Sequence, residues 1–537
     1  MPRVSVEARE ARKEPGETVD RDTKGRRPGS PRAFDFAAFA AWLGRLAAAE
    51  THNLVHAELE ASVEPREGRV EVAASLRLHA LDPKAGASGV AVAFLLAPHL
   101  ELSAAGLDGL PLTPVGDPAP GDALRVFGVR RGVAPGPGAE PTPRCEADHA
   151  AGREETLELE TLELRYSGRL PSEWDSPAAA ELAVYNLWHP LFSGALRPFT
   201  FRLILRVPPD TVPAVSGRLV PLPPELVPHG HGDAGPRTYL WESVCPTGDV
   251  AVAVGPYAVH QGRAADLILE VFALPEDYAL GQALLGWAER LLPVLERWFG
   301  TLPLHDRVGL VLTPTSNWGG YTRPAHIVLP QPLAAGLLGA EDDRRRVALW
   351  LAHEMSHLWF GAVVASDTVR EPWLSEGLAE FGRLVAVEAF WGAEAYRETL
   401  ARYAARVAGA AHPVPMREVI VDHPEMDVLA RVRGGLMLAR LREVVGDAAL
   451  AETLRTFVAR HLAGAVTGEG LPAPRSAQGD ELVSVASRVA GRDLSGFFAE
   501  YLGPEAQHVL LQRPPGHLPQ DHRTGPRQRP KSEDSVL

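Results

Sequence analysis

Cysteine, cationic charge and long apolar runs are all scarce in this chain of 537 residues. The two cysteines, Cys145 and Cys245, exclude a disulfide framework and a thiolate metal cluster, and so few thiols are typical of a reducing compartment. No run reaches the roughly 18 apolar residues that a membrane-spanning helix requires. The apolar stretch 34–49 has helical spacing instead, which predicts an amphipathic helix. We therefore expect no membrane span and a cytoplasmic location.

The chain is acidic, because 54 Lys and Arg residues face 68 Asp and Glu residues, a formal net charge of −14. An excess of negative charge disfavours phosphate backbones, so nucleic acid is not expected as a partner. Hydrophobic residues make up 45% and charged residues 23%, a balance that excludes a mostly disordered or collagen-like chain. The composition carries no signal for a particular oligomeric state.

Two hydrophobic patterns divide the chain. Segments of the first half, such as 69–81 and 199–207, alternate apolar and polar residues at period two, as strands do. Helical periodicity begins at 278–300 and then dominates, apart from a strand predicted at 308–313. The sequence therefore predicts an α+β fold, with an N-terminal antiparallel β domain followed by a mainly helical domain. The expected boundaries are a disordered tail at 1–32, the β-rich domain at 33–262, the helical domain at 263–510 and a second tail at 511–537.

One predicted helix, over 342–363, contains the sequence His353-Glu354-Met355-Ser356-His357. Histidines at i and i+4 lie on the same face of a helix, one turn apart, so both rings can reach one zinc ion. Glu354 lies one position round from the first histidine, where its carboxylate can take a proton from an attacking water. The pattern alone is only moderately specific in a chain with 19 histidines. The residues around it must therefore decide whether it is a metal site.

A second predicted helix, 376–390, supplies a third candidate ligand. Ser375 is expected to cap this helix, and Glu376 lies nineteen positions after His357. If the loop between the helices folds the second one back, Glu376 joins the two histidines. Two histidines and one glutamate leave one position of a tetrahedral zinc open, which is typical of catalytic rather than structural sites.

These residues resemble the signature of the aminopeptidase N family of gluzincin zinc metallopeptidases. The stretches that carry the resemblance are HEMSHLWFG, WLSEGLAEF, GPYAVHQ and GGLMLARLREVVGD. The resemblance extends over about 50–510 and implies a saddle-shaped β domain followed by a thermolysin-like catalytic domain. We expect the chain to lack the long C-terminal helical domain of the family. In this respect it resembles the short two-domain bacterial form. By resemblance, His353, His357 and Glu376 hold one zinc ion per chain, and Glu354 is the general base.

The chain departs from the family at the substrate strand. There the family has Gly-x-Met-Glu-Asn, whose glutamate binds the free α-amine of the substrate, whereas this chain has Gly319-Gly320-Tyr321-Thr322-Arg323. Gly319, Gly320 and Tyr321 are still expected to form an edge strand that pairs with a peptide backbone. A threonine hydroxyl cannot supply the charge of the missing carboxylate, and Arg323 would repel an ammonium group.

A second departure concerns the family's oxyanion tyrosine, which lies three residues before the glycine of a later helix. Arg431 occupies that position here. A guanidinium is a plausible oxyanion stabiliser because it carries fixed charge and several donors, and a solvated arginine at a helix start is the equal alternative. Tyr321 is a weaker substitute. Glu354 and Arg431 are therefore the catalytic candidates.

Two acidic residues near the motif are open to plainer interpretations. Asp367 either accepts the outer N–H of a zinc histidine or turns the loop between the ligand helices. Glu380, one turn after Glu376, is expected to be solvated or hydrogen-bonded on its helix.

The sequence thus predicts a zinc metallopeptidase that cuts peptide substrates with activated water, most of all an aminopeptidase. Two alternatives stay open. One is an endopeptidase that does not require a free amine. The other is a zinc-bound peptide-binding protein with weak turnover, because positions 322 and 431 both depart from the family pattern.

Overall fold

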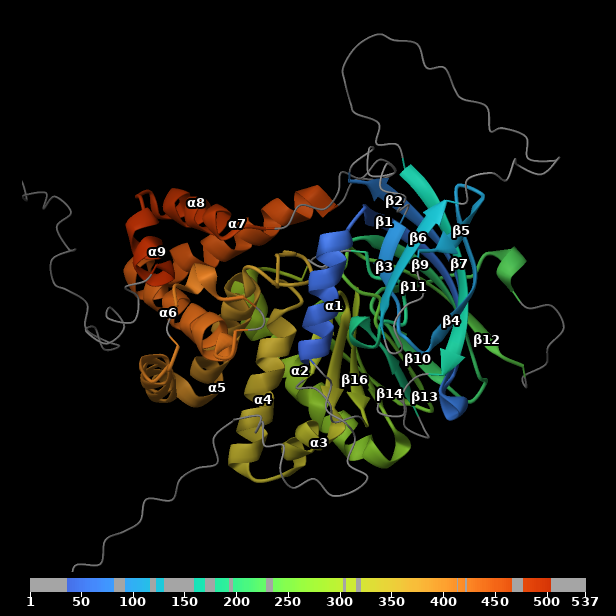
Figure 1. Ribbon diagram of the computed structural model, residues 1–537. Helices are drawn as coiled ribbons and strands as arrows, with labels where there is room; N and C mark the ends of the chain where they lie inside the picture. The colour runs from blue at the N-terminus through green and yellow to red at the C-terminus, as the bar shows by residue number, and fades with distance from the viewer. Residues whose placement is uncertain are drawn as a thin grey trace, which may run out of the picture. The chain divides into compact units, whose positions relative to one another are not determined.

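The computed structural model describes residues 36–81, 92–115, 122–129, 159–169, 179–192, 197–227, 235–302, 306–314, 320–412, 414–420, 423–465 and 477–503. Both predicted tails, 1–32 and 511–537, lie outside the described residues, as do Cys145 and Gly319. The chain from Phe34 onward forms one compact unit. It opens with α1 (Phe36–Ala49), which buries Phe39 and Leu46, so the predicted amphipathic helix is confirmed (Figure 1).

The largest sheet of the β-rich half has, among the described residues, ten strands in the order β11-β12-β9-β1-β2-β7-β4-β5-β6-β3. Its neighbours are antiparallel except β1 and β9. Burial along β2 alternates residue by residue, as the period-two pattern predicts. The strands are β1 (His52–Glu64), β2 (Arg69–Ala80), β3 (Val92–Leu95), β4 (Leu100–Leu107), β5 (Leu110–Pro114), β6 (Leu124–Val129), β7 (Leu159–Arg169), β9 (Thr200–Val207), β11 (Arg218–Val220) and β12 (Arg237–Glu242).

A small sheet connects the β-rich half to the rest of the unit. It has the order β10-β13-β8, formed by Val212–Val215, Val252–Gly255 and Ala180–Leu182. Its alanines pack against residues of the following sheet, and the shared cluster includes Ala214, Ala253, Tyr257, Val311 and Tyr321. Small side chains on one face let the two sheets approach closely, so the edge strand that carries Tyr321 is seated on the β-rich half.

The third sheet, of five strands, is the platform of the helical half. Its order is β14-β15-β16-β18-β17, so β14 and β17 are the two edges. The strands are β14 (Ala258–Ala264), β15 (Leu267–Ala273), β16 (Arg307–Thr313), β17 (Tyr321–Arg323) and β18 (His326–Pro330). The predicted boundary at 262 falls inside β14, which pairs with β15 along its whole length.

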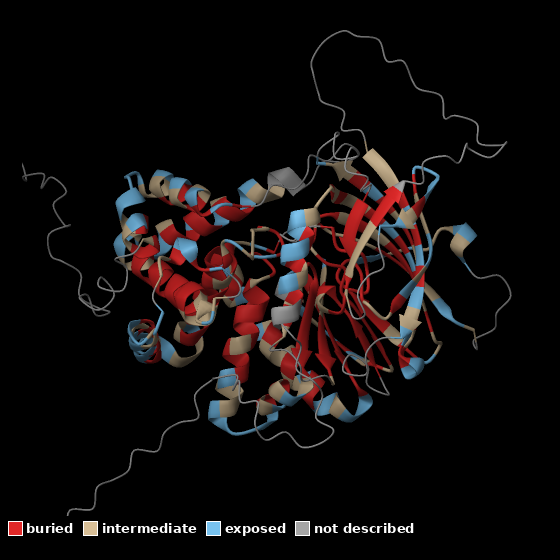
Figure 2. Cartoon of the chain, viewed as in Figure 1, coloured by how far each residue is buried: buried red, intermediate tan, exposed pale blue. Residues whose placement is uncertain are grey.

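Helices pack around this platform and bury a continuous apolar core, seen as the red faces in Figure 2. The antiparallel β domain followed by a mainly helical domain confirms the α+β prediction. None of the described helices is both long enough and apolar enough to cross a membrane. The helices are α2 (Tyr278–Phe299), α3 (Gln331–Ala334), α4 (Glu341–Ser356), α5 (Pro372–Ala408), α6 (Arg433–Val445), α7 (Asp447–Ala465), α8 (Gly479–Ala490) and α9 (Ser495–Leu502).

Candidate metal centre

Helix α4 presents the two histidines at its C-terminal end. It ends at Ser356, seven residues before the predicted end, and His357 follows as the capping residue. The Nδ1 of His357 donates to the carbonyl of Phe360 at 2.9 Å, because the chain turns back immediately after the helix. This turn fixes the ring of the second histidine and allows the next helix to return to it.

Helix α5 brings Glu376 to the histidines. It begins at Pro372, so Ser375 is not the cap that the sequence suggested but a buried residue of the first turn. α5 can lie against α6 because Gly377 faces Gly434, where a Cβ on Gly377 would lie 2.8 Å from the Gly434 Cα. The glycine of the GGLMLARL stretch therefore lets the two backbones meet directly beside Glu376.

His353, His357 and Glu376 each offer one ligand atom, and these atoms lie within 4.8 Å of one another. The two Nε2 atoms are 3.2 Å apart, and the Glu376 carboxylate oxygens lie 3.2 Å and 3.6 Å from them. The Nδ1 atoms point away, toward Glu380 and the Phe360 carbonyl. When both Nδ1 atoms carry protons, both Nε2 atoms present lone pairs to the same point, which fits a divalent cation and suits zinc.

The charges of the cluster are compatible with a bound cation. Burial lowers the pKa of His353, but its hydrogen bonds to Glu376 and Glu380 outweigh burial and raise that pKa to about 9. Burial alone would raise the pKa of Glu376, but the neighbouring His357 and His353 lower it to about 2. The site therefore retains a proton when no metal is bound, and a metal ion must displace it.

Glu380 has surroundings that its position in the sequence does not predict. It is fully buried, and its Oε2 lies 3.0 Å from His353 Nδ1. Its other contacts are Arg431 Nη1 at 3.2 Å, Arg383 Nη1 at 3.8 Å and the hydroxyl of Tyr403. Burial disfavours the charged form, but the two arginines hold the pKa of Glu380 well below its usual range. Glu380 therefore lies where a carboxylate can orient the imidazole of His353.

The structure places Arg431 beside the metal cluster but commits its guanidinium to carboxylates. It lies in a π-helical segment, Asp427–Val432, that leads into α6. Its Nη1 contacts Glu380, and its Nε donates to Asp427 Oδ1. Its role as an oxyanion stabiliser stays a prediction, and the observed contacts are those of a group that holds Glu380 in place.

Glu354 faces the edge strand β17. The carboxylate oxygen Oε2 of Glu354 lies 3.0 Å from Thr322 Oγ1, and Glu354 is almost fully buried. β17 lies close to α4 because Gly320, at φ +101°, has no side chain to collide with the ring of Trp350. Of the three predicted substrate-strand residues, the structure thus describes Gly320 and Tyr321, at the entry and the start of β17.

Arg323 is not the free cation that the sequence suggested. Its Nε donates to Asp249 Oδ2 at 2.9 Å, and Asp249 Oδ1 lies 3.1 Å from His189 Nε2. On the same strand, Tyr321 interacts with the buried carboxylate of Glu181, and burial together with that carboxylate raises the pKa of Tyr321. β17 therefore carries an arginine whose charge is neutralised by Asp249. The carboxylate of Glu181, from β8, interacts with the first residue of β17.

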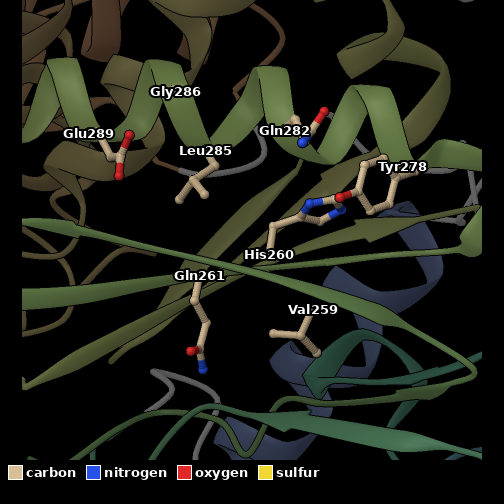
Figure 3. Close-up of a pocket in the computed structure, with 8 residues that line it drawn as sticks. All are labelled: Val259, His260, Gln261, Tyr278, Gln282, Leu285, Gly286 and Glu289. Carbon is tan, nitrogen blue, oxygen red and sulfur yellow. The ribbon is translucent and has the colours of Figure 1, made fainter.

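Two other features do not belong to this centre. Asp367 accepts backbone N–H groups of Val369 and Arg370, so it turns the loop and the plainer interpretation holds. A hollow of about 420 Å³ lies between β14 and α2, with His260, Tyr278 and Glu289 among its lining residues (Figure 3). β14 is the sheet edge opposite β17, so this hollow is separate from the metal cluster.

Comparison with known proteins identifies the helical half. Residues 285–487 match the family described as the Peptidase family M1 domain. This part of the chain is therefore similar to an M1 peptidase domain. The matched segment contains His353, His357 and Glu376, and the resemblance to the aminopeptidase N family is confirmed.

Curated relatives of the M1 domain are aminopeptidases of greater length. Aminopeptidase M1-B of Oryza sativa is 23% identical over 59% of this chain and 35% of its own length. Aminopeptidase N of Lactococcus lactis subsp. lactis is 26% identical over 35% of this chain and 21% of its own length. The chain therefore spans about a third or less of these relatives.

Solved structures share the fold over most of the chain. The M1 zinc metallopeptidase of Deinococcus radiodurans superimposes with a TM-score of 0.59 at 19% identity, covering 85% of this chain and 95% of that one. A mutant of the same protein was solved with a Tyr-Ser-Ala substrate and has a TM-score of 0.58. The β-rich half and the helical half of this chain thus share the fold of that protein.

Proposed function

We propose that this protein is a zinc-dependent aminopeptidase that removes the N-terminal residue of peptides. The observation that carries the proposal is the convergence of His353, His357 and Glu376 on one point, with Glu354 directly after His353 on the same helix. The acidic chain and the cytoplasmic location predicted from its few cysteines are compatible with this activity.

His353, His357 and Glu376 would hold one zinc ion per chain. When bound, zinc supplies a Lewis acid that lowers the pKa of a water molecule and polarises the scissile carbonyl. The Phe360 carbonyl orients the imidazole of His357 by accepting its outer N–H group, and the carboxylate of Glu380, 3.0 Å from His353 Nδ1, orients the other imidazole as its ion-pair partner. The ligand set stays rigid because these groups are themselves buried or part of the backbone.

Glu354 would transfer the proton. It follows His353 directly on α4, so its carboxylate lies at the same end of the helix as the ligand atoms. From there it takes a proton from the attacking water and delivers it to the leaving amine. Its near-complete burial excludes bulk water from competing for that proton.

The substrate backbone would pair with the edge strand β17. Its outer side has no strand partner among the described residues, and this is the side on which an extended peptide can add. An aminopeptidase also needs an anion for the α-amine, and Thr322 cannot provide one. We propose that Glu181 provides it, because its carboxylate interacts with Tyr321, the first residue of β17.

Paired substrates test the aminopeptidase proposal. Aminoacyl-arylamides should be hydrolysed, whereas N-acetylated versions of the same compounds and blocked, internally quenched peptides should not. Replacing Glu181 by glutamine should raise KM for the free-amine substrates by roughly 10- to 100-fold, because the contact is charge-assisted. An exposed control, Glu225→Gln, should leave KM unchanged. Cleavage of blocked and free peptides at equal rates would instead establish an endopeptidase.

A further inference from the structure

Thr322 occupies an unusual position between the substrate strand and the metal helix. It lies in the middle of β17, paired with Ile327 of β18, and its side chain reaches across to α4. Its Oγ1 is 2.9 Å from the backbone carbonyl oxygen of Glu354 and 3.0 Å from the carboxylate oxygen Oε2. One hydroxyl proton can serve only one of these acceptors at a time.

The backbone carbonyl of Glu354 has another donor, whereas its carboxylate has none besides Thr322 among the described residues. The N–H of His357 already donates to the Glu354 carbonyl at 3.2 Å. Within the part of the chain that the structure describes, the Glu354 carboxylate accepts a hydrogen bond from Thr322 and from no other group. A hydrogen bond to an ionised acceptor is also stronger than one to a neutral carbonyl.

The two side chains of this contact, Glu354 and Thr322, differ in conformational freedom. A glutamate side chain has three rotatable bonds and adopts several rotamers unless a contact selects one. Threonine is branched at Cβ and stiff at χ1, and the pairing of β17 with β18 fixes its backbone. The hydroxyl therefore comes from a fixed strand and can select one position of the Glu354 carboxylate.

We infer that Thr322 is a positioning residue that holds the carboxylate of Glu354 over the metal centre and couples the peptide-binding strand to the general base. The inference rests on the proposed function but assigns Thr322 a different task from binding the substrate amine. A peptide added to the outer edge of β17 would pair with the same strand that holds the general base, Glu354, in position. Substrate register and base position are thereby set by one element.

The test compares Thr322→Val, which keeps the shape without the hydroxyl, with Thr322→Ser, which keeps the hydroxyl. Loss of one charge-assisted hydrogen bond should lower kcat of the valine variant roughly 10- to 100-fold, with KM within about twofold of the original. Serine should restore most of kcat. Zinc content should be equal in all variants. Thr453→Val removes a buried hydroxyl that bonds only within α7, and should leave kcat unchanged.

Three kinetic results would overturn the inference: an unchanged kcat for Thr322→Val, a loss confined to KM, or a serine variant as impaired as valine. If valine prevents folding, Thr322→Ala and Thr322→Ser form a second pair that differs only in the hydroxyl. Crystal structures of the zinc-loaded variants provide a second test that does not depend on catalytic activity. Glu354 should adopt one conformation in the original protein and in the serine variant, but several in the valine variant. One shared conformation in all three would contradict the inference, whereas an inactive original protein would contradict only the proposed function.

Discussion

Replacing Glu354 by glutamine should reduce turnover by roughly 10²- to 10⁴-fold, the usual contribution of a positioned general acid–base group. Glutamine has the same shape and still accepts a hydrogen bond from Thr322 through its amide oxygen. It cannot take a proton from water, so the loss should fall on kcat. Zinc content should stay the same, because Glu354 is not among the three residues that offer a ligand atom.

A matched control for this variant lies on the same helix. Glu341, in the first turn of α4, is largely exposed and pairs with Arg344. Glu341→Gln should leave kcat, KM and zinc content unchanged. Turnover by Glu354→Gln at the rate of this control would show that another group, or no protein group, transfers the proton.

Replacing Glu380 by leucine should weaken both the fold and the metal site. The free energy of unfolding of the metal-free protein should fall by roughly 3–5 kcal/mol, because Arg431 and Arg383 lose their buried counter-charge. Zinc affinity should fall by roughly 10- to 100-fold, because His353 loses the carboxylate that orients its imidazole. Urea unfolding of the stripped protein and competition with a metal-binding dye measure the two effects separately.

Glu394 offers the comparison for Glu380, since it lies on the same helix in an exposed pair with Arg397. Glu394→Leu should change neither quantity appreciably, because exposed ion pairs contribute little. If Glu380→Leu bound zinc as tightly as the Glu394 variant, the contact at 3.0 Å would be a packing neighbour and not a determinant of metal binding.

The clustering of His353, His357 and Glu376 was predictable because its geometry is mostly local. His353 and His357 share a helix face by virtue of spacing alone. Glu376 required one further assumption, that the chain folds back between two helices, and the turn at His357–Phe360 meets it. The boundaries of those helices were less predictable. Helix periodicity continued through 363, but the structure ends α4 at Ser356, where the returning chain and not the pattern determines the end.

The contacts around the ligands could not be predicted, because they join residues far apart in the sequence. Glu380 is a charged residue one helical turn after Glu376, and nothing in that spacing predicts its burial. It is buried because α5 packs against the segment that contains Arg431. At Thr322 the sequence shows only that the family's carboxylate is missing. The contact of Thr322 with Glu354 joins residues 32 positions apart, so the sequence does not predict it. Arg323 was interpreted as a free charge because its partner, Asp249, lies 74 positions earlier.

The central claim, that a zinc ion held by His353, His357 and Glu376 drives peptide hydrolysis, has one direct test. Hydrolysis of a panel of aminoacyl-arylamides should be measured while zinc is quantified in the same sample, before and after treatment with a chelator. The account predicts about one zinc per chain, loss of turnover on removal, and recovery in proportion to the zinc restored. Turnover that survives complete removal of metal would contradict it, and so would full zinc occupancy without hydrolysis of any peptide substrate.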